Sequence, residues 1–552
     1  MFRKREAQSS LFATSLLVPP AKAQRLQASW AEVFRERALP LLEEERFASL
    51  YSDDQGRPNR PVQTVLGGLL LKEMFDLTDA EALEHLEFNL LWHHALQLPP
   101  EEAHLCQKTL HNFRAGVLQQ ELMQVAFAAI TDRVIGVLGT QVSRQRLDST
   151  HVVGNMAVLT RLGLFCETLR VFLSRLATAH PRLSVQVPGR LRGRYLKEDG
   201  KPTAYGDARA DQGRRRLAVC ARDVYRLCAL YRGTAAASLD EYGLLARLLQ
   251  EQCAVVRQKQ RPARDDDDHG EGRVPVVLKD AKQVSSASLQ SPHDPEATYS
   301  GHKGKGYALQ VAETCHPDNA VEIITQVALT DACQSDAQAT LPTLAALAER
   351  GQRPAELVAD TSYGSGETAV QAQRLGTEVV SPVSGPTVVP PTAPSAALTL
   401  ADFQVDPRPE EPAICPAGHF AVAQVAVPSA PERVVLTFAR QTCQACPAFA
   451  RCPVRAARTP EGYQLTVDLV AANLARRRRE QDAGVFRPRY AIRAGIEATH
   501  SELKRRHGLS RLRVRGRARI LLAAQLKAIA CNLKRMVRAL MSEPAVAVAA
   551  AG

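Results

Sequence analysis

A carboxylate set among cations is the feature of this sequence that most directly implies chemistry. The chain between Pro488, which suits a first helical turn, and Gly508, which suits a C-terminal cap, has the pattern of one helix. At 100° per residue, about 60° of arc holds four side chains, those of Tyr490, Arg493, Glu497 and Lys504. A separate apolar stripe is formed by Ile492, Ile496 and Leu503. One face should therefore pack, while the other presents an acid, two cations and a phenol.

Such a face suits phosphodiester chemistry. An arginine and a lysine, here Arg493 and Lys504, can bind phosphate oxygens, and Glu497 can ligate a hard divalent cation. One carboxylate is too few, and two more are expected from strands, Asp148 within one and Asp360 at the end of another. Three such acids can hold two Mg²⁺ or Mn²⁺ ions about 3.5–4 Å apart, on either side of a scissile phosphate.

These residues resemble a known family. The spacing Tyr490-x2-Arg493-x3-Glu497-x6-Lys504 is similar to the Tyr-Arg-Glu-Lys signature of one branch of the DDE transposases encoded by bacterial insertion sequences. The segment from Asp360 to Gly364 resembles the family's second-acid motif, and the N-terminal region, with Thr109 to Arg114, resembles the InsH-type N-terminal domain. The resemblance covers nearly the whole chain.

The resemblance implies a fold, a reaction and roles for single residues. The core would be ribonuclease-H-like, with Asp148, Asp360 and Glu497 as catalytic, metal-binding acids. Water would cleave DNA at the ends of a mobile element to leave a 3′-OH, which would then attack target DNA. Because no covalent protein–DNA intermediate is needed, Tyr490 is expected to contact phosphate beside Arg493 and Lys504.

The first acid has two rivals. Asp148 is favoured, but a long helical insertion separates its strand from the next predicted strand, at 307–314. A ribonuclease-H-like core usually keeps its first three strands close in sequence. Asp280, which follows Val276-Val-Leu, and Asp294 therefore remain alternatives.

The net charge of +12 is concentrated near the C-terminus. Residues 471–540 contain 19 Lys or Arg and four acids, a net +15, which leaves −3 for the rest of the chain. A concentrated basic stretch is typical of nucleic-acid binding, although a solvated helix or a patch for anionic membranes has the same composition. The arginines expected to follow the DNA backbone are Arg476, Arg477, Arg478, Arg479, Arg511, Arg513, Arg515, Arg517 and Arg519.

The chain divides into an α/β catalytic core, ribonuclease-H-like, with helical additions and a cysteine-bearing insert. Residues 1–140 are expected to be a helical DNA-binding domain, in which Gln107 to Arg114 can belong to a helix-turn-helix reader or to a packing helix. The other predicted segments are the first core strand (141–156), a helical insertion and linker with four aspartates at 265–268 (157–296), core strands and a helix (297–385), a Pro-rich linker and possible zinc insert (386–460), C-terminal catalytic helices (461–541) and a tail (542–552).

Four of the 12 cysteines gather in the 386–460 segment. Cys443-x2-Cys446, with Cys415 and Cys452, can supply thiolate ligands to a structural Zn²⁺, with His419 as a substitute ligand. The alternative is that they are reduced core cysteines. The others are scattered along a long chain, which fits a reducing cytoplasm.

Function and location follow from these patterns. We expect a bacterial, cytoplasmic, nucleoid-associated enzyme that binds element ends and target DNA and works as a homo-oligomer. A run of roughly 18 apolar residues, as needed to cross a membrane, is absent. The alternatives are an inactive or repurposed DNA-binding protein, and a metal-dependent nuclease without strand transfer.

Overall fold

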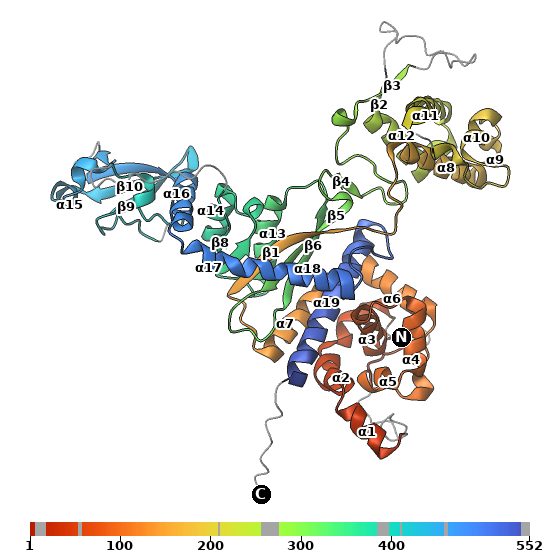
Figure 1. Ribbon diagram of the computed structural model, residues 1–552, viewed down its shortest axis with the longest axis horizontal. Coiled ribbons are helices and arrows are strands. Elements are labelled where there is room, and N and C mark those ends of the chain that lie inside the picture. Colours follow the sequence, from red (N-terminus) through yellow and green to blue (C-terminus); the bar gives the residue numbers. More distant parts are fainter. Residues whose placement is uncertain are drawn as a thin grey trace.

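The computed structural model describes residues 1–5, 18–52, 58–207, 210–255, 275–383, 397–408, 411–457 and 462–542. The predicted acidic linker at 265–268, much of the Pro-rich linker and nearly all of the tail lie outside these ranges. A mixed sheet occupies the centre, and the N-terminal helices surround the long C-terminal helix beside it (Figure 1). The helical insertion and the cysteine-bearing region project from the sheet in different directions.

The N-terminal region is helical, as predicted. Its main helices are α3 (Val62–Met74), α4 (Asp79–Phe88), α5 (Leu90–Ala95), α6 (Gln107–Gln119) and α7 (Leu122–Leu138). Thr78 is the N-cap of α4, and its hydroxyl and the Glu81 carboxylate form a capping box. Asp79 is the first helical residue and pairs with Arg114 of α6. This pair joins the two helices.

The central sheet mixes parallel and antiparallel strands. Its strands are β1 (Arg144–Val152), β4 (Thr298–Ser300), β5 (Gly304–Thr314), β6 (Ile324–Asp331), β7 (Glu356–Ala359) and β8 (Glu378–Val380). On one side, the central strand β1 pairs antiparallel with β5, and β5 also pairs with β4 and β6. On the other side, β1 pairs parallel with β7, and β7 pairs with β8. The connecting helices are α13 (Thr340–Glu349) and α14 (Gly366–Arg374). The predicted core segment at 297–385 thus contains strands and helices, in the order β5, β6, α13 and β7 over residues 304–359.

The C-terminal helix α19 (Arg517–Ser542) joins the sheet to the N-terminal helices. It packs on α3, α7 and β6, and Ile529 and Leu533 are fully buried in a core that also contains Leu66, Phe127 and Val311. The N-terminal helices and one side of the sheet thus share one hydrophobic core. The domain boundary at residue 140 stays a prediction.

Two smaller regions have cores of their own. The helical insertion contains α8 (Arg161–Ala179), α10 (Gly189–Tyr195), α11 (Ala210–Tyr231) and α12 (Asp240–Gln252), with a ribbon of β2 (Cys253–Val255) and β3 (Val276–Leu278). The cysteine-bearing region contains β9 (Ala423–Val427), β10 (Ala430–Ala439), α15 (Arg440–Gln444), β11 (Arg455–Ala456), β12 (Gly462–Asp468) and α16 (Leu469–Asp482). Across the described ranges, no helix has the length and apolar character needed to cross a membrane.

Candidate active site

Two of the predicted acids lie side by side, one on the central strand β1 and the other directly after β7. The parallel strands β1 and β7 are in register at Leu147 and Ala359, so Asp148 and Asp360 are the next residues on the two strands. Burial raises the pKa of Asp148 above its ordinary value, and the nearby Asp360 carboxylate raises it further, while Arg493 opposes the shift. The sheet therefore brings these two carboxylates together.

The third predicted acid approaches the pair from a separate helix. Glu497 is in the first turn of α18 (Gly495–Arg506), and its side chain is 71% exposed. Arg493 lies between the acids, with one guanidinium nitrogen 2.9 Å from Asp148 and another 3.4 Å from Glu497. The ligand atoms of the three acids do not all lie within 4.8 Å of one another. An arginine thus bridges carboxylates that could hold cations.

Tyr490 and Lys504, the other members of the predicted helical face, contribute to the same site. Tyr490 stacks on Phe486 with ring centroids 5.1 Å apart. Burial raises the pKa of Tyr490, Arg493 opposes that shift, and the Asp360 and Asp148 carboxylates add to it. Burial lowers the pKa of Lys504, and Lys303 lowers it further. The Tyr490 phenol thus interacts with the charges of Asp148 and Asp360, and the Lys504 amine interacts with the charge of Lys303.

The predicted single helix from Pro488 to Gly508 was wrong in one respect. The segment consists of α17 (Phe486–Ala491), a 3-10 turn (Ile492–Ala494) and α18. The tighter turn exposes the Ile492 carbonyl to Arg146 of β1, which donates a hydrogen bond to it at 2.7 Å. A Cβ atom on Gly495 would lie only 2.2 Å from the same guanidinium, so glycine at the start of α18 leaves room for Arg146 in this position. Gly508, with φ +62°, ends α18 as predicted.

A buried carboxylate fixes α18 on the sheet. Glu313 of β5 is fully buried and accepts hydrogen bonds from Arg146 at 2.8 Å and from the Thr499 hydroxyl at 2.6 Å. Arg535 of α19 lies 3.3 Å from its other oxygen. Because two cations and a hydroxyl satisfy this buried charge, removal of any one partner would disturb the seat of α18.

Neither rival for the first acid lies on the sheet. Asp280 caps a short 3-10 turn after β3, in a capping box with Gln283. Asp294 is fully buried in the loop before β4, and one of its oxygens accepts a hydrogen bond from Tyr307 at 2.6 Å. Only Asp148 of the three is on the strand beside the one that ends at Asp360.

Two residues near the acids escaped the sequence reasoning. Lys303, between β4 and β5, donates to the Ser149 hydroxyl at 2.9 Å and lies near Asp148. Asp336, just before α13, accepts from Ser149 at 3.1 Å and from Gln310 at 2.9 Å. The only sequence signal for Lys303 is its place in the turn Gly301-His-Lys-Gly-Lys-Gly306. Asp336 has no motif that marks it.

The predicted DNA-binding arginines lie in two places. In α16, Arg476 pairs with Glu480 and Glu378, and Arg479 pairs with Asp402. Arg477 is buried and donates to the Gly364 and Ser381 carbonyls, each at 2.9 Å. The surface role predicted for Arg477 is therefore wrong, because this side chain holds the loop after Asp360 in place. Arg478 is partly exposed on the same helix.

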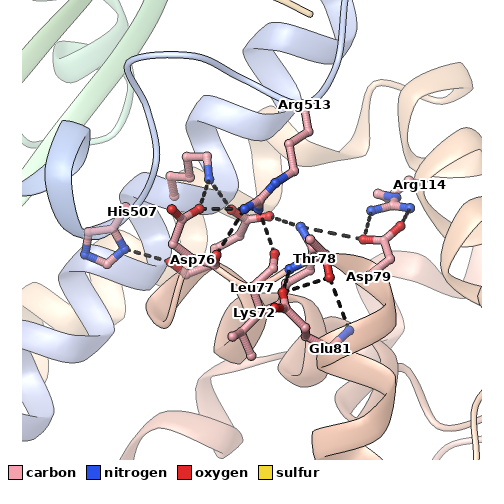
Figure 2. A network of polar contacts seen from close by, with 11 residues as sticks. Lys72, Asp76, Leu77, Thr78, Asp79, Glu81, Arg114, His507 and Arg513 are labelled. Atoms are coloured by element: carbon pink, nitrogen blue, oxygen red, sulfur yellow. Dashed lines mark hydrogen bonds and ion pairs between the residues drawn. The ribbon is translucent and has the colours of Figure 1, made fainter.

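The second group of arginines lies beside the N-terminal helices. Arg513 donates to the Leu77 carbonyl at 2.8 Å and pairs with Asp76 at 3.3 Å (Figure 2). A groove of about 840 Å³ lies between α6 and these arginines. Gln107 and His111 line it from α6, and Arg511 and Arg519 line it from the other side. Arg511, Arg513, Arg515 and Arg519 are exposed, and Arg517 is bound to Asp331 and the Leu329 carbonyl.

The four cysteines of the insert share one cavity. It measures about 230 Å³ and is lined by Cys415, Cys443, Cys446, Cys452 and His419. Burial raises the pKa of Cys443, and the three neighbouring thiols raise it further. All four are free thiols, and a structural zinc needs ligands of this type and number.

Comparison with known families gives two matches, both to transposases. The transposase DDE domain matches residues 414–537, and the transposase domain DUF772 matches residues 28–116. No curated protein and no solved structure matches the chain. Both matched families are transposase families, which confirms the resemblance to DDE transposases of insertion sequences drawn from the sequence. Such enzymes act on DNA and generally use divalent metal ions. The first match contains Glu497 but neither Asp148 nor Asp360.

Proposed function

We propose that this transposase cuts and joins DNA at the ends of its insertion sequence by metal-dependent phosphodiester hydrolysis and strand transfer. The observation that carries the proposal is the meeting of Asp148, in the middle of β1, with Asp360, which directly follows the adjacent strand β7; Glu497 faces them and Arg493 lies between. Three oxygen-donor acids around one arginine suit a site that binds both hard cations and phosphate.

The donor set fits two Mg²⁺ or Mn²⁺ ions held by Asp148, Asp360 and Glu497. Bound ions would supply activation of water and neutralisation of charge on the phosphate. Arg493, once released from the acids, would hold a phosphate oxygen, and Lys504 and Lys303 would hold the backbone on either side. Tyr490 would donate its phenolic proton to a phosphate. Water would cleave the P–O3′ bond to leave a 3′-OH. That 3′-OH would then attack a phosphodiester of target DNA, where the bond from phosphorus to the target's own 3′ oxygen breaks and that oxygen leaves as a 3′-OH.

A ribonuclease-H-like core is part of this proposal. The sheet has an antiparallel pair, β5 and β6, on one side of β1, and two parallel strands, β7 and β8, on the other. The helical insertion separates β1 from β5 in sequence, yet the two strands pair over eight residues. This topology supports a ribonuclease-H-like core interrupted after its first strand.

The path of the DNA is proposed from the exposed cations. Helix α6 exposes Lys108, His111 and Asn112 beside the groove that Arg511, Arg513 and Arg519 line from the other side. A duplex on this face would meet side chains able to read base edges and arginines able to bind phosphates. Residues 1–140 would thus recognise the element ends, and Arg515, Arg476, Arg478 and Arg479 would extend the contact.

The remaining expectations concern assembly. Cys415, Cys443, Cys446 and Cys452 would hold a structural Zn²⁺ that orders the region before α16. Two element ends require two active sites, so the enzyme would work as a homo-oligomer on DNA. It would act at the bacterial chromosome, in the cytoplasm.

The decisive experiment combines cleavage and joining of DNA that carries the element ends. Wild-type protein should cleave and join with Mg²⁺ and lose both reactions in EDTA. D148A, D360A and E497Q should lose cleavage while they still bind the same DNA. D280A, outside the sheet, is the matched control and should retain activity. Full activity of D148A would refute the choice of first acid, and a covalent adduct at Tyr490 would refute the mechanism.

A further inference from the structure

Three side chains of different chemistry meet where α18 ends against α19. Glu502 lies near the end of α18, His507 is the C-cap residue of that helix, and Cys531 lies in the middle of α19. One ligand atom of each lies within 4.8 Å of the other two. Within the part of the chain that the structure describes, no other group of acidic, histidine or cysteine side chains converges in this way.

The orientation of His507 indicates what the group can bind. Its ring is fully buried, and Nδ1 lies 2.8 Å from the Glu73 carbonyl of α3. Because a carbonyl oxygen can only accept, Nδ1 carries the proton and Nε2 presents a lone pair. Nε2 is buried without a hydrogen-bond partner. Figure 2 shows this ring at the contact between the C-terminal segment and the N-terminal helices.

A second shell of this kind is typical of metal-binding histidines. A carbonyl that receives the proton of one ring nitrogen fixes the tautomer and aims the other nitrogen at the ion. A buried acceptor without a partner is otherwise destabilising, and a cation bound at Nε2 would remove that cost.

The other two side chains complete a suitable ligand set. Cys531 is fully buried, so its thiol is shielded from solvent. Glu502 lies 2.9 Å from Arg535 through Oε2, and its Oε1 has only a longer contact, 4.0 Å, to Arg538. Arg535 is also shared with the buried Glu313, so its charge is balanced elsewhere. A carboxylate and a thiolate together would neutralise a divalent ion.

We propose that Glu502, His507 and Cys531 form a structural site for one divalent transition metal, with Zn²⁺ the best match. One oxygen, one imidazole nitrogen and one sulfur are ligands that Zn²⁺ accepts in tetrahedral geometry, with water in the fourth position. The ion would tie α18 to α19 and, through the Glu73 carbonyl, to α3. It would hold the helix that carries Glu497 without taking part in phosphodiester chemistry.

The test uses Co²⁺ as the probe in the full-length chain. Because the cysteine cavity offers thiols and the proposed active site offers carboxylates to Co²⁺, the background is C443S/C446S/D148N/E497Q. Its two serine changes lie in a core separate from that of α19. This protein should bind about one equivalent of Co²⁺. H507N, whose amide can still donate to the Glu73 carbonyl but has no atom at Nε2, should lose that equivalent, as should C531A. C228A, a buried cysteine of the helical insertion, should retain it.

Two results would overturn the proposal. The first is a background protein that binds no Co²⁺, and the second is an H507N or C531A variant, folded by circular dichroism, that binds as much as the background. If those variants do not fold, X-ray absorption of Co²⁺ in the background protein decides. One sulfur neighbour among nitrogen and oxygen neighbours supports the site. A shell with no sulfur, or with several, contradicts it.

Discussion

At the scale of single residues, Arg493 has the most informative position. It contacts Asp148 and Glu497. Burial raises the pKa of Asp148, and Arg493 opposes that shift because it favours the charged carboxylate. R493Q removes that cation, so the pKa of Asp148 should rise further. The acid limb of the pH–rate profile for Mg²⁺-dependent DNA cleavage should therefore move to higher pH, and the maximal rate should fall by roughly 10-fold or more because a phosphate contact is lost.

The matched control for this prediction is R493K, which keeps the charge but cannot bridge two acids with a planar fork. Its acid limb should move less than that of R493Q. An R493Q enzyme with an unchanged limb and an unchanged maximal rate would show that the bridge has no part in catalysis.

Lys303 makes a separate residue-scale prediction. Its amine lies near Asp148, donates a hydrogen bond to the Ser149 hydroxyl and is 4.0 Å from Asp336. If it binds a phosphate, K303A should weaken DNA binding about equally for all sequences and reduce the slope of log K against log salt by about one. Binding isotherms at several salt concentrations measure this slope. K201A, on an exposed lysine of the helical insertion, should leave the slope unchanged.

What the sequence revealed at this scale depended on spacing. Glu497 and Arg493 could be found because helical spacing groups them. Asp148 could be selected only provisionally, since the parallel strand beside it comes from far along the chain: Leu147 pairs with Ala359, 212 residues later. Arg477 could not be told from its neighbours in the arginine run, because the loop that it holds comes from a distant part of the chain.

At the scale of elements, the seat of α18 should make stability depend on pH. His500 is buried on this helix, and burial lowers its pKa to about 4, with Lys504 and Arg493 adding to the effect. An unfolded histidine has a pKa of about 6.5, so the unfolded state binds more protons between these values and stability falls as pH drops from about 6.5 to about 4, by roughly 3 kcal/mol in all.

H500N removes this titration. Its melting temperature should fall less than that of the wild type when the pH is lowered from 7 to 4.5, as measured by calorimetry, although His507 will keep part of the slope. H104N, on an exposed histidine, should behave as wild type. A wild-type slope in H500N would mean that the ring is already charged or exposed in the native state.

Sequence periodicity predicted most elements of the sheet and of the N-terminal region, but not their junctions. The sequence indicated a strand at 307–314, which lies within β5, and the helical character of residues 1–140. It did not mark the 3-10 turn before α18, whose cause is the contact between Arg146 and the Ile492 carbonyl. Such a contact joins residues far apart in the chain, so no local pattern reports it.

At the scale of the whole molecule, the basic excess is divided between sites rather than spread over one surface. Arginines of α16 lie at the far edge of the sheet from the N-terminal helices, while Arg511, Arg513 and Arg519 face α6 (Figure 1). Several cations of the segment instead neutralise buried acids, as Lys527 does for Glu73 and Arg535 for Glu313. The charge count therefore overstates the surface available to DNA.

The separate cores also predict how the molecule should lose structure. The cysteine-bearing region has its own core around Leu436, Phe438 and Val467, distinct from the core that α19 shares with the sheet. If its thiols hold zinc, C446S should release that ion and remove hydrogen-exchange protection from β9, β10 and β12. Protection in β1 and β5 should remain, because their pairing does not depend on that core. C333S, on an exposed cysteine near the sheet, should change neither zinc content nor exchange. Loss of protection throughout the molecule would show instead that the two cores unfold as one.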